Sequence, residues 1–367
     1  TMGDLMEQFY GTKSKIIAGT LGLMTSICIA SMEMIVLGIV LQSLLGVKAS
    51  WGVWIAGGAL ALYSAHGGIK AVTTTDVLQF AVLIIAIPMA AIVVVKHAGG
   101  VANMLAQVPE TKFNILEHEK FSYYFTLFLI WSFIPAGMID PAIIQRLLMS
   151  KRPDQLRKQY LIMAGISPLL RLIIMLIGLA GVVLYPTLEA TKLFPHLIEE
   201  LMPVGIKGIT IAGVLAVSTS TIDSYLHVCG LTFAHDVLEP ICQQRNITIN
   251  ELRWARYSTL LIGIIAVMIG AAGAGATTDT ILGFAFTALG FTGPLLMFPL
   301  LAGIMGLKIK NHIFYIALCV TLGAYVIAQL VLPPDQSHLT MLITIAANGI
   351  AFFGAHFLLA PRSASVH

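Results

Sequence analysis

Long apolar stretches separated by short polar segments recur along the whole chain. A helix needs about 20 mostly apolar residues to cross a bilayer. The pattern predicts ten membrane-spanning helices, at residues 16–45, 51–69, 77–95, 121–144, 160–185, 205–231, 256–275, 280–305, 312–332 and 339–360. The longest connections are 96–120, 186–204 and 232–255. We therefore expect a single all-α domain that crosses the membrane repeatedly.

The composition supports a membrane protein and excludes two other classes. Of the 367 residues, 57% are hydrophobic and 11% are charged, whereas a soluble globular domain has about 25% charged residues. So few charges cannot cover a water-soluble surface. The net charge of +3 is too small to indicate nucleic-acid binding. We expect the lipid bilayer to be the partner of most of the surface.

The distribution of Lys and Arg predicts the orientation. Cytoplasmic loops carry more Lys and Arg than loops on the opposite side. With ten alternating spans, 14 of the 21 Lys and Arg residues lie on the side of the chain ends and 6 on the other, and Arg171 lies within a span. We expect a multi-pass protein of the inner (plasma) membrane, with both ends of this chain in the cytoplasm.

Two predicted spans contain helix-breaking residues at membrane depth. The breakers are Pro135-Ala136-Gly137 and Asp140-Pro141 in span 121–144, and Gly290, Gly293-Pro294 and Pro299 in span 280–305. Unsatisfied backbone groups cannot face lipid, so broken helices at this depth usually line a cavity or an ion site. The alternative for each span is a proline kink packed against neighbouring helices.

A run of hydroxyl residues, 218–224, interrupts span 205–231 and includes the acid Asp223. Residues three and four apart share a helix face. The stripe expected on one face consists of Val217, Ser220, Thr221 and Ser224. Hydroxyls and a freed carbonyl are hard oxygen ligands suited to Na⁺. The alternative is that each hydroxyl donates to the carbonyl four residues earlier. Because five hydroxyls occur in seven residues, we favour an ion site.

Four ionisable residues lie deep in the predicted spans: Glu33, Asp140, Arg171 and Asp223. Charges inside a membrane are costly and usually have a partner or a function. We expect Arg171 to pair with Asp140 or Asp223, in either a structural or a functional role. Glu33 stands in an otherwise apolar helix. Its carboxyl group either meets a cationic or amine-bearing substrate or is protonated and bonded to a neighbouring helix.

Asp76 follows three threonines at a point where a cytoplasmic loop is expected to enter a helix. This arrangement is typical of a helix N-cap. A carboxylate at the inner mouth of a transport path would also attract a cation. Both roles are compatible with the sequence.

Three motifs resemble the sodium:solute symporter family, which includes the sodium/proline, sodium/galactose and sodium/iodide symporters. Residues 67–79, GGIKAVTTTDVLQ, resemble the signature GG-x-x-AV-x-x-TD-x-x-Q. Residues 220–224, STIDS, resemble the family's ST-x-DS helix. Residues 141–146, PAIIQR, followed by Lys151, resemble the end of its broken sixth core helix. The resemblance covers nearly the whole chain.

The resemblance implies an inverted-repeat fold of five plus five helices, with a substrate site at the midplane. It implies sodium ligands at the carbonyl of Val217 and the hydroxyls of Ser220 and Thr221, with Asp76 near that site. The substrate contacts that we expect are Glu33, from its position, and Trp131, Phe133, Gly137 and Asp140, from the resemblance. Sugar transporters carry bulky aromatic gates where this chain has Pro135-Ala136-Gly137, which argues against a sugar.

The resemblance also implies how the single transmembrane domain, 1–367, is divided. Residues 1–95 would be a remnant of the first repeat, 121–305 the second repeat, and 312–360 two peripheral helices. Thr1–Gly11 resembles the short loop before the family's third core helix. We therefore expect the first two core helices, which supply the remaining sodium ligands, to be absent.

The function that we expect is sodium-coupled symport of a small organic solute, an amino acid or a carboxylate. The coupling ion would be Na⁺, without an organic cofactor, and the partners would be the solute, sodium and the bilayer. One alternative is the membrane sensor module of a transporter-like histidine kinase, and another is a truncated transporter that is inactive alone. An intramembrane enzyme using His227 and Asp223 is a third, but no enzyme motif accompanies them, so we expect a transporter.

Overall fold

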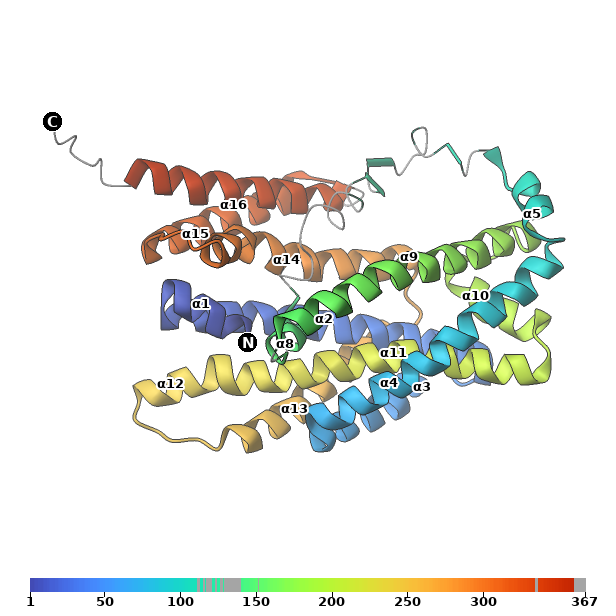
Figure 1. Cartoon of the computed structure of the whole chain (residues 1–367), viewed down its shortest axis with the longest axis horizontal. Helices are drawn as coiled ribbons and strands as arrows, with labels where there is room; N and C mark the ends of the chain where they lie inside the picture. The colour runs from blue at the N-terminus through green and yellow to red at the C-terminus, as the bar shows by residue number, and fades with distance from the viewer. Residues whose placement is uncertain are drawn as a thin grey trace.

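The protein was analysed as a computed structural model. The structure describes residues 1–110, 113–114, 116, 121–122, 124–125, 128, 140–150, 152–333 and 336–359, and their side chains except those of 278–280, 282–291 and 337. Over these residues the fold is helical, without a β-strand. Figure 1 shows the long helices lying side by side along the long axis of the molecule.

The first half of the described chain contains α1 (Met2–Tyr10), α2 (Thr12–Leu45), α3 (Ala49–Gly52), the π-helix η1 (Val53–Gly57), α4 (Gly58–His97), α5 (Val101–Gln107) and α8 (Pro141–Leu148). The second half contains α9 (Pro153–Leu184), α10 (Ala190–Leu201), α11 (Val204–Thr232), the π-helix η4 (Phe233–Leu238), α12 (Glu239–Gln244), α13 (Glu251–Ala272), α14 (Thr278–Ile304), α15 (Asn311–Val331) and α16 (Ser337–Leu359).

Seven helical segments of the described chain are long and apolar enough to cross a membrane: Thr12–Leu45, Ala49–His97, Pro153–Leu184, Val204–Gln244, Glu251–Ala272, Asn311–Val331 and His338–Leu359. They contain eight of the ten predicted spans, because Ala49–His97 holds both 51–69 and 77–95. The span at 280–305 coincides with α14. The span at 121–144 lies mostly outside the described residues.

Gly68 divides α4 into two legs. Its φ of 63° and ψ of −177° are non-helical, and a positive φ costs glycine little because it lacks a Cβ. The Tyr63 hydroxyl lies 3.2 Å from Thr75 Oγ1, although twelve residues of straight helix would separate them by about 18 Å along the axis. The chain therefore folds back at Gly68, as the two predicted spans require.

The second leg resumes directly after Gly68, so the prediction that Asp76 caps a helix is wrong. Asp76 lies inside the helix. The threonines before it donate to carbonyls four residues earlier: Thr73 to Ile69 at 2.9 Å, Thr74 to Lys70 at 2.8 Å and Thr75 to Ala71 at 3.0 Å. Their hydroxyls are satisfied within the helix rather than at its start.

Helix α11 lies at the centre of one half of the bundle and packs against α2, α4 and α13. Small residues permit this close approach. A Cβ added to Gly213 of α11 would lie 2.5 Å from the Cβ of Ala86, and one added to Gly263 of α13 would lie 2.6 Å from the Cβ of Ala61. The first contact joins α11 to the second leg of α4, and the other joins α13 to the first leg.

The other half of the bundle joins α1 to the C-terminal helices. The ring of Tyr10 stacks on Phe314 at 5.3 Å between centroids and meets the edge of Phe352 at 6.4 Å. Its hydroxyl donates to the carbonyl of Pro299 at 2.8 Å. Helix α14 is continuous across Pro294 and Pro299, so the span predicted at 280–305 is not a broken helix.

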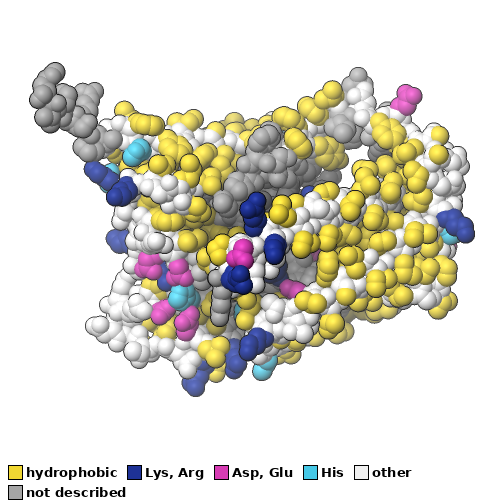
Figure 2. All heavy atoms as spheres, viewed as in Figure 1, with side chains coloured by type: hydrophobic (Ala, Val, Ile, Leu, Met, Phe, Trp, Pro, Cys, Tyr) yellow, Lys and Arg dark blue, Asp and Glu magenta, His cyan; other side chains and the backbone are white. Residues whose placement is uncertain are grey.

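Hydrophobic side chains cover much of the visible face of the molecule. Figure 2 shows them spread over its right half and upper part, while charged side chains gather mainly at the left and near the centre. Many large apolar residues of the predicted spans are exposed, including Ile55, Ile92 and Leu330 at 68%, 68% and 81%. A surface of this kind suits a bilayer rather than water.

Candidate functional site

Helix α11 separates two cavities. The polar cavity has a volume of about 440 Å³, and its lining includes Asp76, Asp140, Arg146, Ser220, Thr221 and Tyr225. The apolar cavity has a volume of about 480 Å³, and its lining includes Glu33, Phe194, Thr210, Val217 and Ser218. Neighbouring residues of the hydroxyl run therefore face different spaces.

Two of the three predicted sodium ligands, Ser220 and Thr221, line the polar cavity, and both bond to the backbone carbonyl of the third, Val217. Ser220 donates its hydroxyl to the carbonyl oxygen of Val217 at 2.9 Å, and Thr221 donates to the same oxygen at 3.1 Å. The hydroxyls are therefore bonded back along the helix, as the alternative interpretation of the run expected. A hydroxyl that donates still has lone pairs for a cation, so the three oxygens form one convergent oxygen-rich patch.

The side chain of Val217 departs from the predicted stripe. It is 40% exposed and lines the apolar cavity, so only its carbonyl joins Ser220 and Thr221. Thr219 does not line the polar cavity either. Its hydroxyl donates to the carbonyl of Leu215 at 2.8 Å and accepts from Gln79 at 2.8 Å. Helical spacing groups Val217 with Ser220 and Thr221 on one face of α11. Spacing does not show where around the helix one cavity ends and the other begins, and the side chain of Val217 lies on the apolar side.

Arg146 connects three helices across the polar cavity. From α8, its guanidinium forms an ion pair with Asp76 of α4 at 2.8 Å. It also donates to the hydroxyl of Ser224 on α11. The sequence placed Arg146 in a family motif but gave no partner for it. The partners are 70 and 78 residues away in the chain, beyond the reach of a local pattern.

Asp140 holds the start of α8. Its Oδ1 accepts from the backbone N–H groups of Ala142 at 2.8 Å and Ile143 at 3.1 Å, and its Oδ2 accepts from the hydroxyl of Tyr225. An N-cap of this kind satisfies the first backbone donors of a helix. Both oxygens of the predicted substrate residue are thus engaged in fixing α8 beside α11.

The predicted ion pair of Arg171 is wrong. Asp223 is 2% exposed and accepts from Ser64 of α4 at 2.8 Å, while Asp140 bonds to α8 and Tyr225. Arg171 is exposed on α9 and forms no ion pair with a carboxylate of the described chain. Neutral hydroxyls and backbone groups, rather than a buried cation, satisfy the two acids.

The predicted substrate residues are only partly brought together. Glu33 lines the apolar cavity and Asp140 the polar one, so the two acids do not share a site. Trp131, Phe133 and Gly137 lie outside the described residues. Ser218 forms a side-chain hydrogen bond with Glu33 and had no separate role in the sequence-based prediction.

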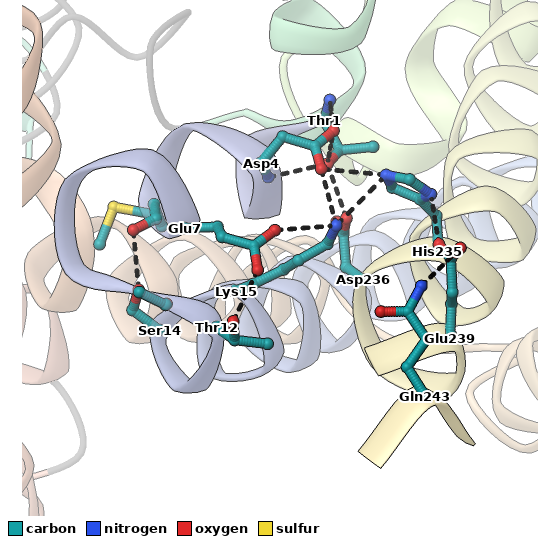
Figure 3. A network of polar contacts seen from close by, with 12 residues as sticks. Thr1, Asp4, Glu7, Thr12, Ser14, Lys15, His235, Asp236, Glu239 and Gln243 are labelled. Atoms are coloured by element: carbon teal, nitrogen blue, oxygen red, sulfur yellow. Dashed lines mark hydrogen bonds and ion pairs between the residues drawn. The ribbon is translucent and has the colours of Figure 1, made fainter. Parts of the chain in front are cut away.

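A second cluster of charges, the α1 network, ties α1 to α2 and η4 (Figure 3). Lys15 Nζ contacts Asp4 Oδ1 at 2.8 Å and Glu7 Oε2 at 3.2 Å. His235 Nε2 meets the same Asp4 oxygen at 2.9 Å, and its Nδ1 faces Glu239 at 3.0 Å and Glu251 at 2.9 Å.

Asp4 is the hub of the α1 network. Burial alone would raise its pKa, but hydrogen bonds from His235 and Lys15 outweigh burial and hold the pKa of Asp4 well below its usual value. A lowered pKa means that folding stabilises the ionised carboxylate. The sequence did not predict this network, because its central contact joins Asp4 to His235, which are 231 residues apart.

The model of the sodium:solute symporter family matches residues 1–312. The chain belongs to this family. The high-affinity proline transporter PutP of Bacillus subtilis (strain 168) is 26% identical over 316 residues, which are 82% of this chain and 65% of PutP. The sodium/glucose cotransporter of Vibrio parahaemolyticus is 24% identical over 311 residues, which are 74% of this chain and 57% of the cotransporter.

The fold agrees with a solved member of the same class. A Na⁺-coupled sialic acid symporter in a substrate-bound outward-open state superposes with a TM-score of 0.80 at 17% identity, covering 98% of this chain and 78% of that chain. The predicted resemblance, the symporter fold and the multi-pass membrane character are confirmed. This chain spans 65% of the length of PutP and 57% of that of the glucose cotransporter.

Proposed function

We propose that this protein carries out sodium-coupled symport of a small organic solute. The observation that carries the proposal is that the hydroxyls of Ser220 and Thr221, two residues that line the polar cavity, converge on the carbonyl of Val217. Family membership supports sodium as the coupling ion. The relatives that the chain matches are transporters, which supports a carrier rather than an enzyme.

Asp76 is proposed to attract the ion toward this patch. It lines the same cavity as Ser220 and Thr221, and a carboxylate in a confined cavity raises the local concentration of cations. Arg146 offsets part of this charge through its ion pair with Asp76. Release of that pair would strengthen the attraction of Asp76 for sodium.

The position of α11 between the cavities supports a coupling route. Ser220 and Thr221 face the polar cavity, while Val217 and Ser218 face the apolar one, within about one turn of the helix. Sodium that orders this turn would also order a wall of the apolar cavity. Two ligands that stabilise the same arrangement raise each other's affinity by the same factor.

The setting of the proposed transporter follows the sequence-based expectations. We propose the inner (plasma) membrane, with both ends of this chain in the cytoplasm, because the Lys and Arg residues are biased to that side. Residues 1–95 and 121–305 would belong to the two repeats and 312–360 to the peripheral helices. The lining of the apolar cavity bears on the class of the solute.

The test is sodium-dependent uptake by the full-length gene product in proteoliposomes. Each hydroxyl that a cation uses contributes about 1.5–3 kcal/mol, so we expect the double variant Ser220→Ala/Thr221→Ala to need at least about tenfold more sodium for half-maximal uptake. The matched control is Thr20→Val. Thr20 is exposed on α2 and donates to the carbonyl of Ile16 at 2.8 Å, the same back-bonding geometry away from the cavity.

Sodium binding measured directly with ²²Na⁺ separates ion binding from transport. We expect weakened ²²Na⁺ binding in the double variant and wild-type binding in Thr20→Val. An unchanged sodium dependence in the double variant, at wild-type expression and thermal stability, would refute the proposed site.

A further inference from the structure

The apolar cavity contains a single carboxyl group in an otherwise uncharged lining. Glu33 and Val36 belong to α2, and the remaining lining comes from α4, α9, α10 and α11. No Lys, Arg or His is among the described residues that line it. The volume of about 480 Å³ lies within the range of small-molecule sites. We propose that this cavity binds an apolar solute that carries an ammonium group, with Glu33 as its counter-ion.

The proposal rests on the proposed function only in that the bound solute is taken to be the transported one. The hydroxyl of Ser218 is the hydrogen-bonding partner of Glu33 that the structure records, and a hydroxyl is neutral. An ionised carboxylate in an apolar membrane setting is costly without a cation. A solute ammonium group would supply that cation.

The same geometry disfavours an anionic solute. A carboxylate placed in this cavity would face the charge of Glu33 without a basic residue in the described lining to offset it. Arg171, the cation nearest in sequence to the lining residue Ile174, is exposed on α9 and is not part of the lining. Two like charges brought together in such surroundings weaken binding by several kcal/mol, even when the ligand otherwise fits. Binding sites reject unsuitable ligands in this way.

A second polar group in the lining would orient a bound solute. Thr210 of α11 is 2% exposed, lines the cavity, and its Oγ1 has no hydrogen-bond partner among the described residues. A buried hydroxyl without a partner costs free energy that a ligand donor or acceptor would recover. Thr210 therefore offers a second polar contact, while Phe194, Ile177 and Val217 offer apolar surface for the body of the solute.

The solute class is thus an amine with an apolar body and a second polar group. The cavity is distinct from the polar one, where Asp140 is already bonded to α8 and Tyr225. Placing the solute against Val217 and Ser218 also puts it on the α11 turn whose other side carries the proposed sodium ligands.

Three probes of one shape test the charge requirement: phenethylammonium, neutral 2-phenylethanol and anionic 3-phenylpropionate. Their binding to the purified protein in detergent is measured by calorimetry at saturating sodium. We expect phenethylammonium to bind at least about tenfold more tightly than 2-phenylethanol, and 3-phenylpropionate to bind weakest. Because truncating one member of a desolvated charge pair is costly, Glu33→Gln should weaken phenethylammonium binding by about 30-fold or more and leave 2-phenylethanol unchanged.

The control is Glu200→Gln, since Glu200 is an exposed acid on α10 outside the cavity lining. Equal affinities for the three probes in the wild-type protein would overturn the proposal, and this comparison needs no variant to fold. A preference for phenethylammonium that persists in Glu33→Gln would overturn the role of Glu33. Measured in parallel, ²²Na⁺ binding reports on the sodium site, so a failure there is distinguishable from a failure at Glu33.

Discussion

Arg146 is the residue whose removal should loosen the polar cavity most selectively. It links α8 to α4 through the ion pair with Asp76 and to α11 through the hydroxyl of Ser224. Helix α8 is short, with eight residues, so a large share of its attachment depends on such side-chain contacts. We predict that Arg146→Gln raises the frequency with which α8 detaches from its neighbours.

The solvent exposure of Arg146 and Asp76 sets how strongly their contacts stabilise α8. The side chains of Arg146 and Asp76 are 49% and 25% exposed, so solvent screens their ion pair and its contribution is about 0.5 kcal/mol. The hydrogen bond from the guanidinium to Ser224 adds about 1 kcal/mol. Together the contacts stabilise the docked α8 by about 1–2 kcal/mol, which corresponds to a change of about 5- to 30-fold in its opening equilibrium.

Amide hydrogen exchange read by mass spectrometry measures this opening. We expect peptides covering 141–148 to exchange about 5- to 30-fold faster in Arg146→Gln, while α13 peptides keep their wild-type rates. The control is Arg152→Gln, because Arg152 pairs with Asp154 at 3.0 Å where both side chains are more than 60% exposed. Wild-type exchange of 141–148 in Arg146→Gln, or equal acceleration in the control, would contradict the bridging role.

Two further predictions concern the contacts that hold α1 and α2. Gly19→Ala should lower the free energy of unfolding by about 1–3 kcal/mol, because the added Cβ would lie 2.5 Å from the Cβ of the buried Asp236. The control is Gly165→Ala, which should not destabilise the protein, because no atom lies within 4 Å of the added Cβ. Because the pKa of Asp4 is lowered on folding, its contribution to stability is complete above its usual value of about 3.8 and is lost as the pH falls below it. Thermal unfolding followed from about pH 5 down to about pH 2 should therefore show a smaller acid loss in Asp4→Asn than in wild type, with the difference appearing below about pH 3.8, and an identical loss would contradict the assignment.

The apolar pattern located eight of the ten predicted spans within helices long and apolar enough to cross a membrane, because a bilayer imposes similar length and composition on every span. Gly68 lies near the end of the first of two adjacent predicted spans, 51–69 and 77–95, and the reversal there requires a residue that tolerates positive φ. The hydroxyls of Ser220 and Thr221 were predicted to converge with the carbonyl of Val217, because helical spacing alone brings those three atoms together.

Contacts between distant helices were not predictable in the same way. Arg171 was expected to pair with a buried acid, yet Ser64 and Tyr225 satisfy Asp223 and Asp140 without it. Spacing along one helix says nothing about which neutral donor a second helix presents. The separation of Glu33 from Asp140 has the same cause, since it depends on how α11 is rotated between the two cavities.

Residue 217 is proposed to contact the ion through its backbone and the solute through its side chain, and this difference affects how the protein can evolve. A backbone oxygen is present whatever amino acid occupies the position, whereas the side chain of residue 217 shapes the apolar cavity. With the two proposed sites, substitution there would change the fit of a solute and preserve the oxygen proposed to hold the ion. Solute preference would then drift at this position by single mutations, and varying residue 217 would retune selectivity while retaining the coupling ion.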